Sequence, residues 1–301
     1  RKKTVSIILG SLALCVALFM LLFKIIVPGG IRSANFTTAY ATMGNSRFSF
    51  VAGVSSGTSG NSNITIDTSG NPDNDVDHLF PKDDVCFAPS SLIGCRDSTT
   101  YEVASTEGAD GDQFTIGTPL GTTLEATDLV VATQSGIITL TVTLATTVPD
   151  GGDIYISIPM ADSVDGNDGF PDYNTAVSTS GFDLNGIAAG NLGISTSTSG
   201  TCNNSHWSVG TATVTEGSGS GDHTIRIDRS GSSCEANSTI LTITLGDASK
   251  GIVNPAPINT SRTQGAADEY TINIKTRDNT DSTIDSSNVM IAPVEAVLVS
   301  A

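Results

Sequence analysis

Apolar and polar residues alternate with a period of two in many short runs along most of the chain. The clearest runs are 136–144, 153–158, 239–245 and 270–274, which are rich in Ile, Val and Thr and lie among turn residues such as Gly, Asp and Asn. Alternation gives each strand one buried face and one solvent-exposed face, as in antiparallel sheets. No 12-residue window past residue 41 shows the 3.6-residue period of a helix. The pattern therefore predicts an all-β fold.

The pattern differs only at the start, where an apolar run of 19 residues, Val5–Phe23, follows three basic residues. This length is long for a signal peptide and just sufficient for a membrane-spanning helix. The sequence thus predicts an N-terminal hydrophobic helix within residues 1–34, either a cleaved signal peptide or a retained membrane anchor. Both alternatives place Asn35 onward outside the cell, because the basic end stays in the cytoplasm.

The exported part divides near residue 135. Short strand patterns in residues 35–135 predict a small β domain, and longer ones in residues 136–301 predict an antiparallel, Ig-like β-sandwich of about seven strands. The last strand pattern, Asn288–Val299, could pair with a neighbouring subunit by strand addition. Candidate assembly contacts are therefore Val289 and Ile291 in this strand, and Val5, Ile8 and Leu12 in the N-terminal helix.

The chain carries five cysteines, of which Cys15 lies in the apolar run. An even number of cysteines in an exported domain indicates disulfides, and the other four allow three pairings. The local pairing agrees best with two domains, and it joins Cys86 to Cys95 and Cys202 to Cys234. A zinc site is disfavoured because the sequence contains no Cys-x-x-Cys pair.

The charge balance excludes one class of partner. The chain has 31 acidic and 14 basic side chains, a formal net charge of −17, whereas phosphate binding needs clustered Lys and Arg. No nucleic-acid partner is expected. No GxSxG, HExxH, GxGxxG or P-loop motif occurs, and the His residues occupy polar segments, so no enzymatic activity is expected either.

Two acid-rich loops are candidate calcium sites, because calcium favours six to eight oxygen ligands on a flexible loop. One loop, Asp73–Asp84, begins with an Asp-x-Asp-x-Asp spacing but does not complete an EF-hand. Both loops are also consistent with ordinary solvated turns of an acidic protein. The better candidate offers five side-chain oxygen ligands within eleven residues, namely Asp162, Asp165, Asn167, Asp168 and Asp172.

Several segments together resemble one group of proteins: 40–50 (YATMGNSRFSF), 79–85 (LFPKDDV), 100–105 (TYEVAS), 147–159 (TVPDGGDIYISIP), 253–255 (VNP), 265–272 (GAADEYTI) and 284–287 (IDSS). With the basic and apolar start, they resemble the secreted surface proteins of candidate-phyla-radiation (Patescibacteria-type) bacteria. The resemblance implies an exported, surface-layer-like β-sandwich protein of the cell envelope, and it carries no catalytic residues over. The cysteine pairs depart from that pattern.

These observations favour an exported cell-surface structural protein, located outside the cell, that forms a homo-oligomer or polymer as a surface layer, a filament or an adhesive subunit. It would contact the membrane through the N-terminal helix if that helix is not cleaved. The alternative is a monomeric, anchored module that binds a glycan or a protein through Phe170, Tyr173 and Trp207. Packing of these three aromatic residues inside the fold is the favoured interpretation of their role.

Overall fold

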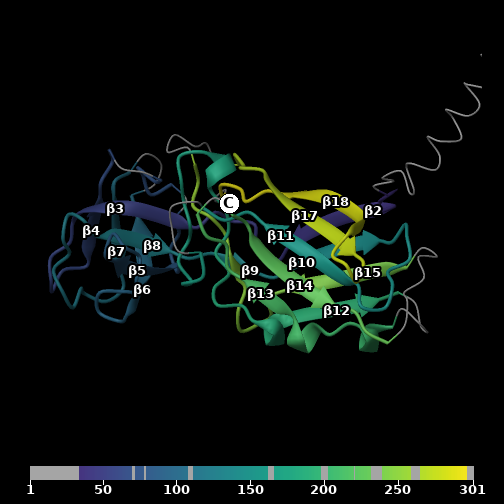
Figure 1. The fold of residues 1–301 in the computed structure, drawn as a ribbon. Coiled ribbons are helices and arrows are strands. Elements are labelled where there is room, and N and C mark those ends of the chain that lie inside the picture. Colours follow the sequence, from purple (N-terminus) through teal and green to yellow (C-terminus); the bar gives the residue numbers. More distant parts are fainter. Residues whose placement is uncertain are drawn as a thin grey trace, which may run out of the picture. The chain divides into compact units, whose positions relative to one another are not determined.

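The computed structural model describes residues 34–69, 72–77, 79–107, 111–161, 166–197, 203–219, 221–231, 239–258 and 265–296 (Figure 1). Contacts between residues divide the chain into two units, 1–34 and Asn35–Ala301. The predicted N-terminal helix, with Val5, Ile8 and Leu12, lies outside the described residues. In the described part of the chain, no helix has the length and apolar character that crossing a bilayer requires.

The prediction of an all-β fold is confirmed, and the predicted small β domain contains a closed antiparallel barrel (Figure 1). The strands follow one another around the barrel in the order β3-β4-β7-β6-β5-β8. Closure pairs every strand on both sides, so the barrel leaves no open edge. The strands are β3 (Phe50–Ser56), β4 (Asn63–Ile66), β5 (Asp84–Ala88), β6 (Thr100–Thr106), β7 (Gln113–Ile116) and β8 (Leu129–Ala132).

Apolar side chains from every second position fill the barrel. On β7, for example, Phe114 and Ile116 are buried while Gln113 is exposed. The ring of Phe87 stacks on Phe114, with the ring centroids 6.5 Å apart, and lies 5.5 Å from the ring of Tyr101. Burying one such side chain contributes about 1.5–3 kcal/mol, so the filled interior stabilises this small unit.

The remaining strands form two larger antiparallel sheets that share one hydrophobic core, which we call the two-sheet unit. The six-stranded sheet has the order β1-β18-β17-β11-β14-β13, and the four-stranded sheet has the order β12-β15-β10-β2. A short pair, β9 (Ser135–Gly136) with β16 (Ile252–Val253), accompanies them.

The first sheet contains β1 (Ala34–Asn35), β11 (Asp153–Ile158), β13 (Thr213–Thr215), β14 (His223–Asp228), β17 (Tyr270–Arg277) and β18 (Thr283–Ile291). The second contains β2 (Thr38–Met43), β10 (Ile138–Thr143), β12 (Leu192–Thr196) and β15 (Ile240–Leu245). Short 3-10 helices occur at Val177–Thr179, Ala189–Asn191, Asn204–His206 and Val209–Thr211.

The alternation that predicts the strands also selects the core. On β10, Ile138, Leu140 and Val142 are buried, and on β15 Leu241 and Ile243 meet them from the neighbouring strand. Residues from the six-stranded sheet complete the same core. It includes Ile154, Ile156, Ile158, Ile225, Ile227, Ile272, Ile274 and Tyr270.

One segment lies elsewhere than the sequence predicts. The chain of β2 falls within the predicted small domain, residues 35–135, but it pairs with β10 over its whole length, from Thr38 opposite Thr143 to Met43 opposite Ile138. Strands β2 and β10 are thus neighbours in one sheet although the whole barrel lies between them in sequence. The barrel is an insertion into the two-sheet unit.

Candidate functional site

Hydrogen bonds connect the barrel to the two-sheet unit at the point where the chain enters and leaves the barrel. The chain leaves β2 through 44–49 and returns from β8 through 133–137, and a third segment, 251–256, crosses both. Asn254, which is buried, lies at this crossing. Its side-chain amide donates to the carbonyls of Asn45, at 2.9 Å, and Arg47, at 2.8 Å, and its backbone N–H donates to the carbonyl of Gln134.

Ser49 adds hydrogen bonds to this crossing from the barrel side, and we call the hydrogen bonds of Asn254 and Ser49 together the clamp. Its hydroxyl donates to the carbonyl of Asn254 at 2.6 Å and accepts from the backbone N–H of Gln134 at 2.9 Å. Ser49 has no exposed surface. Buried hydrogen bonds of this kind specify geometry because an unmade bond costs about 1–3 kcal/mol. The clamp therefore fixes three chain segments relative to one another.

Two glycines permit the close crossing. A Cβ atom on Gly136 would lie 2.6 Å from the backbone nitrogen of Asn45, and one on Gly251 would lie 2.7 Å from the backbone nitrogen of Gly136. Backbone atoms cannot give way as the end of a flexible side chain can. Larger residues at these two positions would force the segments apart.

A polar pocket of about 370 Å³ opens beside the crossing. Its wall includes Gly44, Ser135, Gly136, Asn185, Asp247, Ser249 and Gly251. The Asp247 carboxylate accepts hydrogen bonds from the hydroxyl and backbone N–H of Ser249, from Asn191 and from the backbone N–H of Lys250. These bonds lower the pKa of Asp247 well below its usual value, so the pocket carries an ionised carboxylate at neutral pH. Such a wall offers hydrogen-bonding groups and one negative charge.

The predicted calcium loop is partly described. Asp162 and Asp165 lie outside the described residues. Asn167 accepts from the backbone N–H of Gly186 at 2.8 Å and so connects the loop to the turn at Gly186. Asp168 accepts from the backbone N–H of Phe170 at 2.8 Å, within the loop. Asp172 is buried. Among the described residues, no three His, Cys, Asp or Glu side chains gather as a metal site would require, and calcium binding here stays a prediction.

A residue that the sequence analysis missed, Asp183, anchors this loop. Its buried carboxylate accepts hydrogen bonds from the backbone N–H groups of Asp168, at 2.9 Å, Gly169, at 3.1 Å, and Asn185. Burial, opposed by these bonds, raises the pKa of Asp183 to about 7. The only sequence signal is its place two residues before Asn-Gly, a spacing typical of turns in which an Asp caps the following backbone.

His223 supports the same region from β14. The sequence analysis places it in a polar segment, but it is the first residue of that strand and is fully buried. Its Nδ1 accepts from the backbone N–H of Gly217 at 3.0 Å, which assigns the hydrogen to Nε2, and Nε2 donates to the carbonyl of Phe182 at 2.8 Å. Burial lowers the pKa of His223 below 6.5, so the neutral ring is the folded form.

In the other acid-rich loop, Asp73–Asp84, carboxylates also accept hydrogen bonds from other parts of the chain. The carboxylate of Asp73 is buried and accepts from the backbone N–H of Val51 at 2.7 Å. Asp83 forms two hydrogen bonds with the guanidinium of Arg47, at 2.7 and 3.0 Å. These carboxylates fasten the loop to strand β3 and to the segment that enters the barrel.

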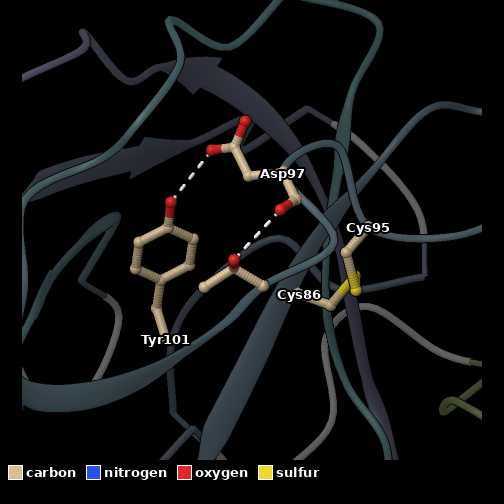
Figure 2. Close-up of a disulfide and its surroundings, with 5 residues drawn as sticks. Cys86, Cys95, Asp97 and Tyr101 are labelled. Atoms are coloured by element: carbon tan, nitrogen blue, oxygen red, sulfur yellow. Dashed lines mark hydrogen bonds between the residues drawn. A yellow bond between two sulfur atoms is a disulfide. The ribbon is translucent and has the colours of Figure 1, made fainter.

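The disulfide between Cys86 and Cys95 is confirmed, and it closes a short ring from β5 (Figure 2). Asp97 and Tyr101 lie beside it, and the phenol of Tyr101 donates to Asp97 at 2.9 Å (Figure 2). The same phenol accepts from the backbone N–H of Gly121 at 3.1 Å. The hydroxyl of Thr122 also donates to Asp97, and its hydrogen bond is the main reason that the pKa of Asp97 is lowered. The other predicted pair, Cys202 and Cys234, lies outside the described residues.

The three candidate aromatic contacts do not form a single exposed surface. Trp207 is only 3% exposed, and the guanidinium of Arg229 lies 4.9 Å from the centre of its ring. Phe170 and Tyr173 are half-buried against a cluster that includes Val51, Cys86, Ala88, Leu92, Leu129, Val131 and Ala256. The favoured interpretation, packing inside the fold, describes all three.

The C-terminal candidate contacts are also placed in the core. β18 pairs with β17 of its own chain, and the side chains of Val289 and Ile291 are 3% and 5% exposed. They pack in the core of the two-sheet unit. Their side chains therefore face inward.

The comparisons with known proteins return no match: no protein-family model matches the chain, and no curated protein sequence is significantly similar to it.

Proposed function

We propose that this protein is an exported, cell-surface structural subunit that assembles with copies of itself into a layer or filament or serves in adhesion. One observation carries the proposal: the barrel is inserted between adjacent strands β2 and β10 and is fastened to the two-sheet unit by the buried Asn254 and Ser49. Segments distant in sequence are thereby held at one point. A fixed connection of this kind suits a building element that must keep its geometry.

Two further features support an extracellular building element. The barrel carries a disulfide, and disulfides persist in oxidising compartments outside the cytoplasm. The buried carboxylate of Asp153 also binds within the chain: Arg277 forms two hydrogen bonds of 2.8 Å with it, and Arg226 approaches it at 3.1 Å. These groups hold strands β11, β14 and β17 together.

The finer parts of the proposal follow from the sequence. We propose that the two-sheet unit is an Ig-like sandwich, that residues 1–34 direct export or anchor the chain in the membrane, and that Cys202 pairs with Cys234. The resemblance to secreted surface proteins is consistent with the first two of these, whereas the Cys202–Cys234 pair rests on the even number of cysteines.

Immunogold electron microscopy on intact cells of the source organism tests the location, and negative-stain microscopy of the extracted full-length protein tests assembly. Labelling at the outer surface, together with a regular layer or filaments, is the expected result. Labelling only in the cytoplasm would overturn the proposal. An unrelated cytoplasmic protein, labelled in parallel, controls for cell lysis.

A second candidate function is binding of a small polar ligand such as a sugar. The polar pocket beside Gly136 and Gly251 favours it, because hydroxyl, amide and carboxylate groups line a volume of about 370 Å³. Saturable binding to a glycan array that is lost in Asp247→Asn would support this alternative. The matched control is Asp278→Asn, whose carboxylate likewise caps a surface turn through Thr280 and Ser282.

A further inference from the structure

The two sheets of the two-sheet unit differ sharply in charge. The strands of the six-stranded sheet contain charged residues, among them Asp153, Arg226 and Lys275. No charged residue occurs in β2, β10, β12 or β15, the four strands of the other sheet. Yet the whole chain carries a net charge of −17. The four-stranded sheet thus presents a neutral face on a strongly acidic molecule.

Hydroxyl groups dominate this neutral face. On β10 the inward positions are Ile138, Leu140 and Val142, so the alternate positions point outward. The register aligns the outward residues in rows across the strands: Thr141 lies between Tyr40 and Thr242, and Thr143 lies between Thr38 and Ile240. Neighbouring residues of one row are about 4.8 Å apart from strand to strand. Thr141 is itself buried, whereas Thr38 and Thr42 on β2 are exposed.

Two large exposed apolar side chains lie on the same face. Tyr40, on β2, is 56% exposed, and Ile240, on β15, is 39% exposed. In the described part of the chain only two other large hydrophobic side chains, Ile93 and Met290, are exposed to this degree. Tyr supplies large apolar area with a hydroxyl that can bond at the rim, and it is common at the centres of protein interfaces.

The net charge of the chain indicates which molecule binds to the neutral face. Two copies that each carry a net negative charge repel each other wherever acidic surfaces meet, and like charges brought together cost free energy. The neutral face is the surface on which a second copy meets no charge from the strands. Because the same face is present on both copies, it can make a two-fold contact in which each Tyr40 meets the partner's equivalent face.

We propose that the neutral face, centred on Tyr40 and Ile240, is a contact between copies of this chain. The inference rests on the proposed function and names the surface that it uses. Four strands of about six residues cover roughly 15 by 20 Å, well below the 800 Å² per partner of a stable interface. The contact is therefore weak. It joins copies in pairs, and this pairing should appear in solution at high protein concentration.

Sedimentation velocity of the full-length chain in mild detergent, over a range of protein concentrations, tests the contact. We expect the average mass of the wild type to rise with concentration. The double variant Tyr40→Asp, Ile240→Glu places two negative charges on the face and should remain at the monomer mass. The matched control, Met290→Asp with Thr271→Glu, adds the same charges at exposed positions of the six-stranded sheet and should associate as the wild type does.

Salt gives a second readout that a contact made of ion pairs would not reproduce. Added NaCl screens the repulsion between acidic copies, so association through a neutral face should strengthen with salt, whereas ion pairs would weaken. Association that weakens with salt, or that the control variant abolishes as completely as the Tyr40 variant, would overturn the proposal. A wild type that stays monomeric at every concentration and salt would do the same.

These outcomes are separable from the proposed function. A chain found at the cell surface that never self-associates leaves the surface location standing and removes the neutral-face contact. A chain that associates through Tyr40 in solution but is absent from the surface removes the location instead. Specific retention of the monomeric wild type on an uncharged polysaccharide, lost in Tyr40→Asp, would overturn the second copy as the occupant.

Discussion

Ser49 and Asn254 are 205 residues apart in sequence, yet the hydroxyl of Ser49 donates a hydrogen bond of 2.6 Å to the carbonyl of Asn254. Ser49 is the last residue before the first barrel strand, and Asn254 follows β16 of the two-sheet unit. Both are buried. This bond, with the two that the Asn254 amide makes, joins the inserted barrel to its host.

Replacing Asn254 by Ala should therefore destabilise the protein. The change removes the amide that donates to the carbonyls of Asn45 and Arg47, and an acceptor left unpaired in a buried place costs about 1–3 kcal/mol. We expect a loss of about 2 kcal/mol in the free energy of unfolding, measured by urea denaturation. Asn61→Ala, at an exposed turn, is the control and should change stability by less than about 0.5 kcal/mol. Equal midpoints for the two variants would show that the clamp contributes no stability.

A pH-dependent loss of stability should arise from His223. Burial lowers its pKa in the folded state below the 6.5 of the unfolded chain, so folding favours the neutral ring. Its contribution is present above pH 6.5 and is lost as the pH falls through the folded pKa. We expect His223→Gln, which does not titrate, to lose less stability than the wild type between pH 6.5 and 5. Denaturation at a series of pH values measures this, and parallel curves for both proteins would contradict it.

Asp183 should make the stability change with pH in the opposite direction to His223. Its folded pKa of about 7 lies above the usual 3.8, so folding favours the protonated acid, and its contribution is present at low pH and is lost as the pH rises from about 4 through about 7. Asp183→Asn removes the titration. We expect the difference in stability between wild type and variant to shift in favour of the wild type as the pH falls from 7 to 5. A difference that does not change with pH over this interval would mean that burial does not perturb this carboxyl.

The strands themselves could be predicted from the sequence because their signal is local. The runs at 136–144, 239–245 and 270–274 appear as β10, β15 and β17, with alternate apolar side chains in the core. Ile240 is an exception, because it lies on the outer face and is 39% exposed. The Cys86–Cys95 bridge is also local, since its two cysteines are separated by nine positions in the sequence.

The partners of these strands could not be predicted in the same way. Nothing in the sequence of Thr38–Met43 indicates that its neighbour is β10, about a hundred residues later, because pairing depends on where the barrel folds between them. Asn254 and Asp183 were missed for a related reason: each bonds to backbone groups, and backbone groups leave no mark in a sequence.

The barrel should also depend on its disulfide. A bridge that closes a ring of about ten residues restricts the unfolded chain and contributes about 3 kcal/mol in the loop-entropy model. We expect the double variant Cys86→Ala, Cys95→Ala to lose about that amount in urea denaturation, and to lower the protection of amide hydrogens in β5 and β8, which flank the bridge, more than in β10 and β15. Wild type in reducing agent should behave as the variant does, provided that peptide mapping confirms that the bridge is open. An unchanged unfolding midpoint in both would show that packing of Phe87, Tyr101 and Phe114 alone holds the barrel.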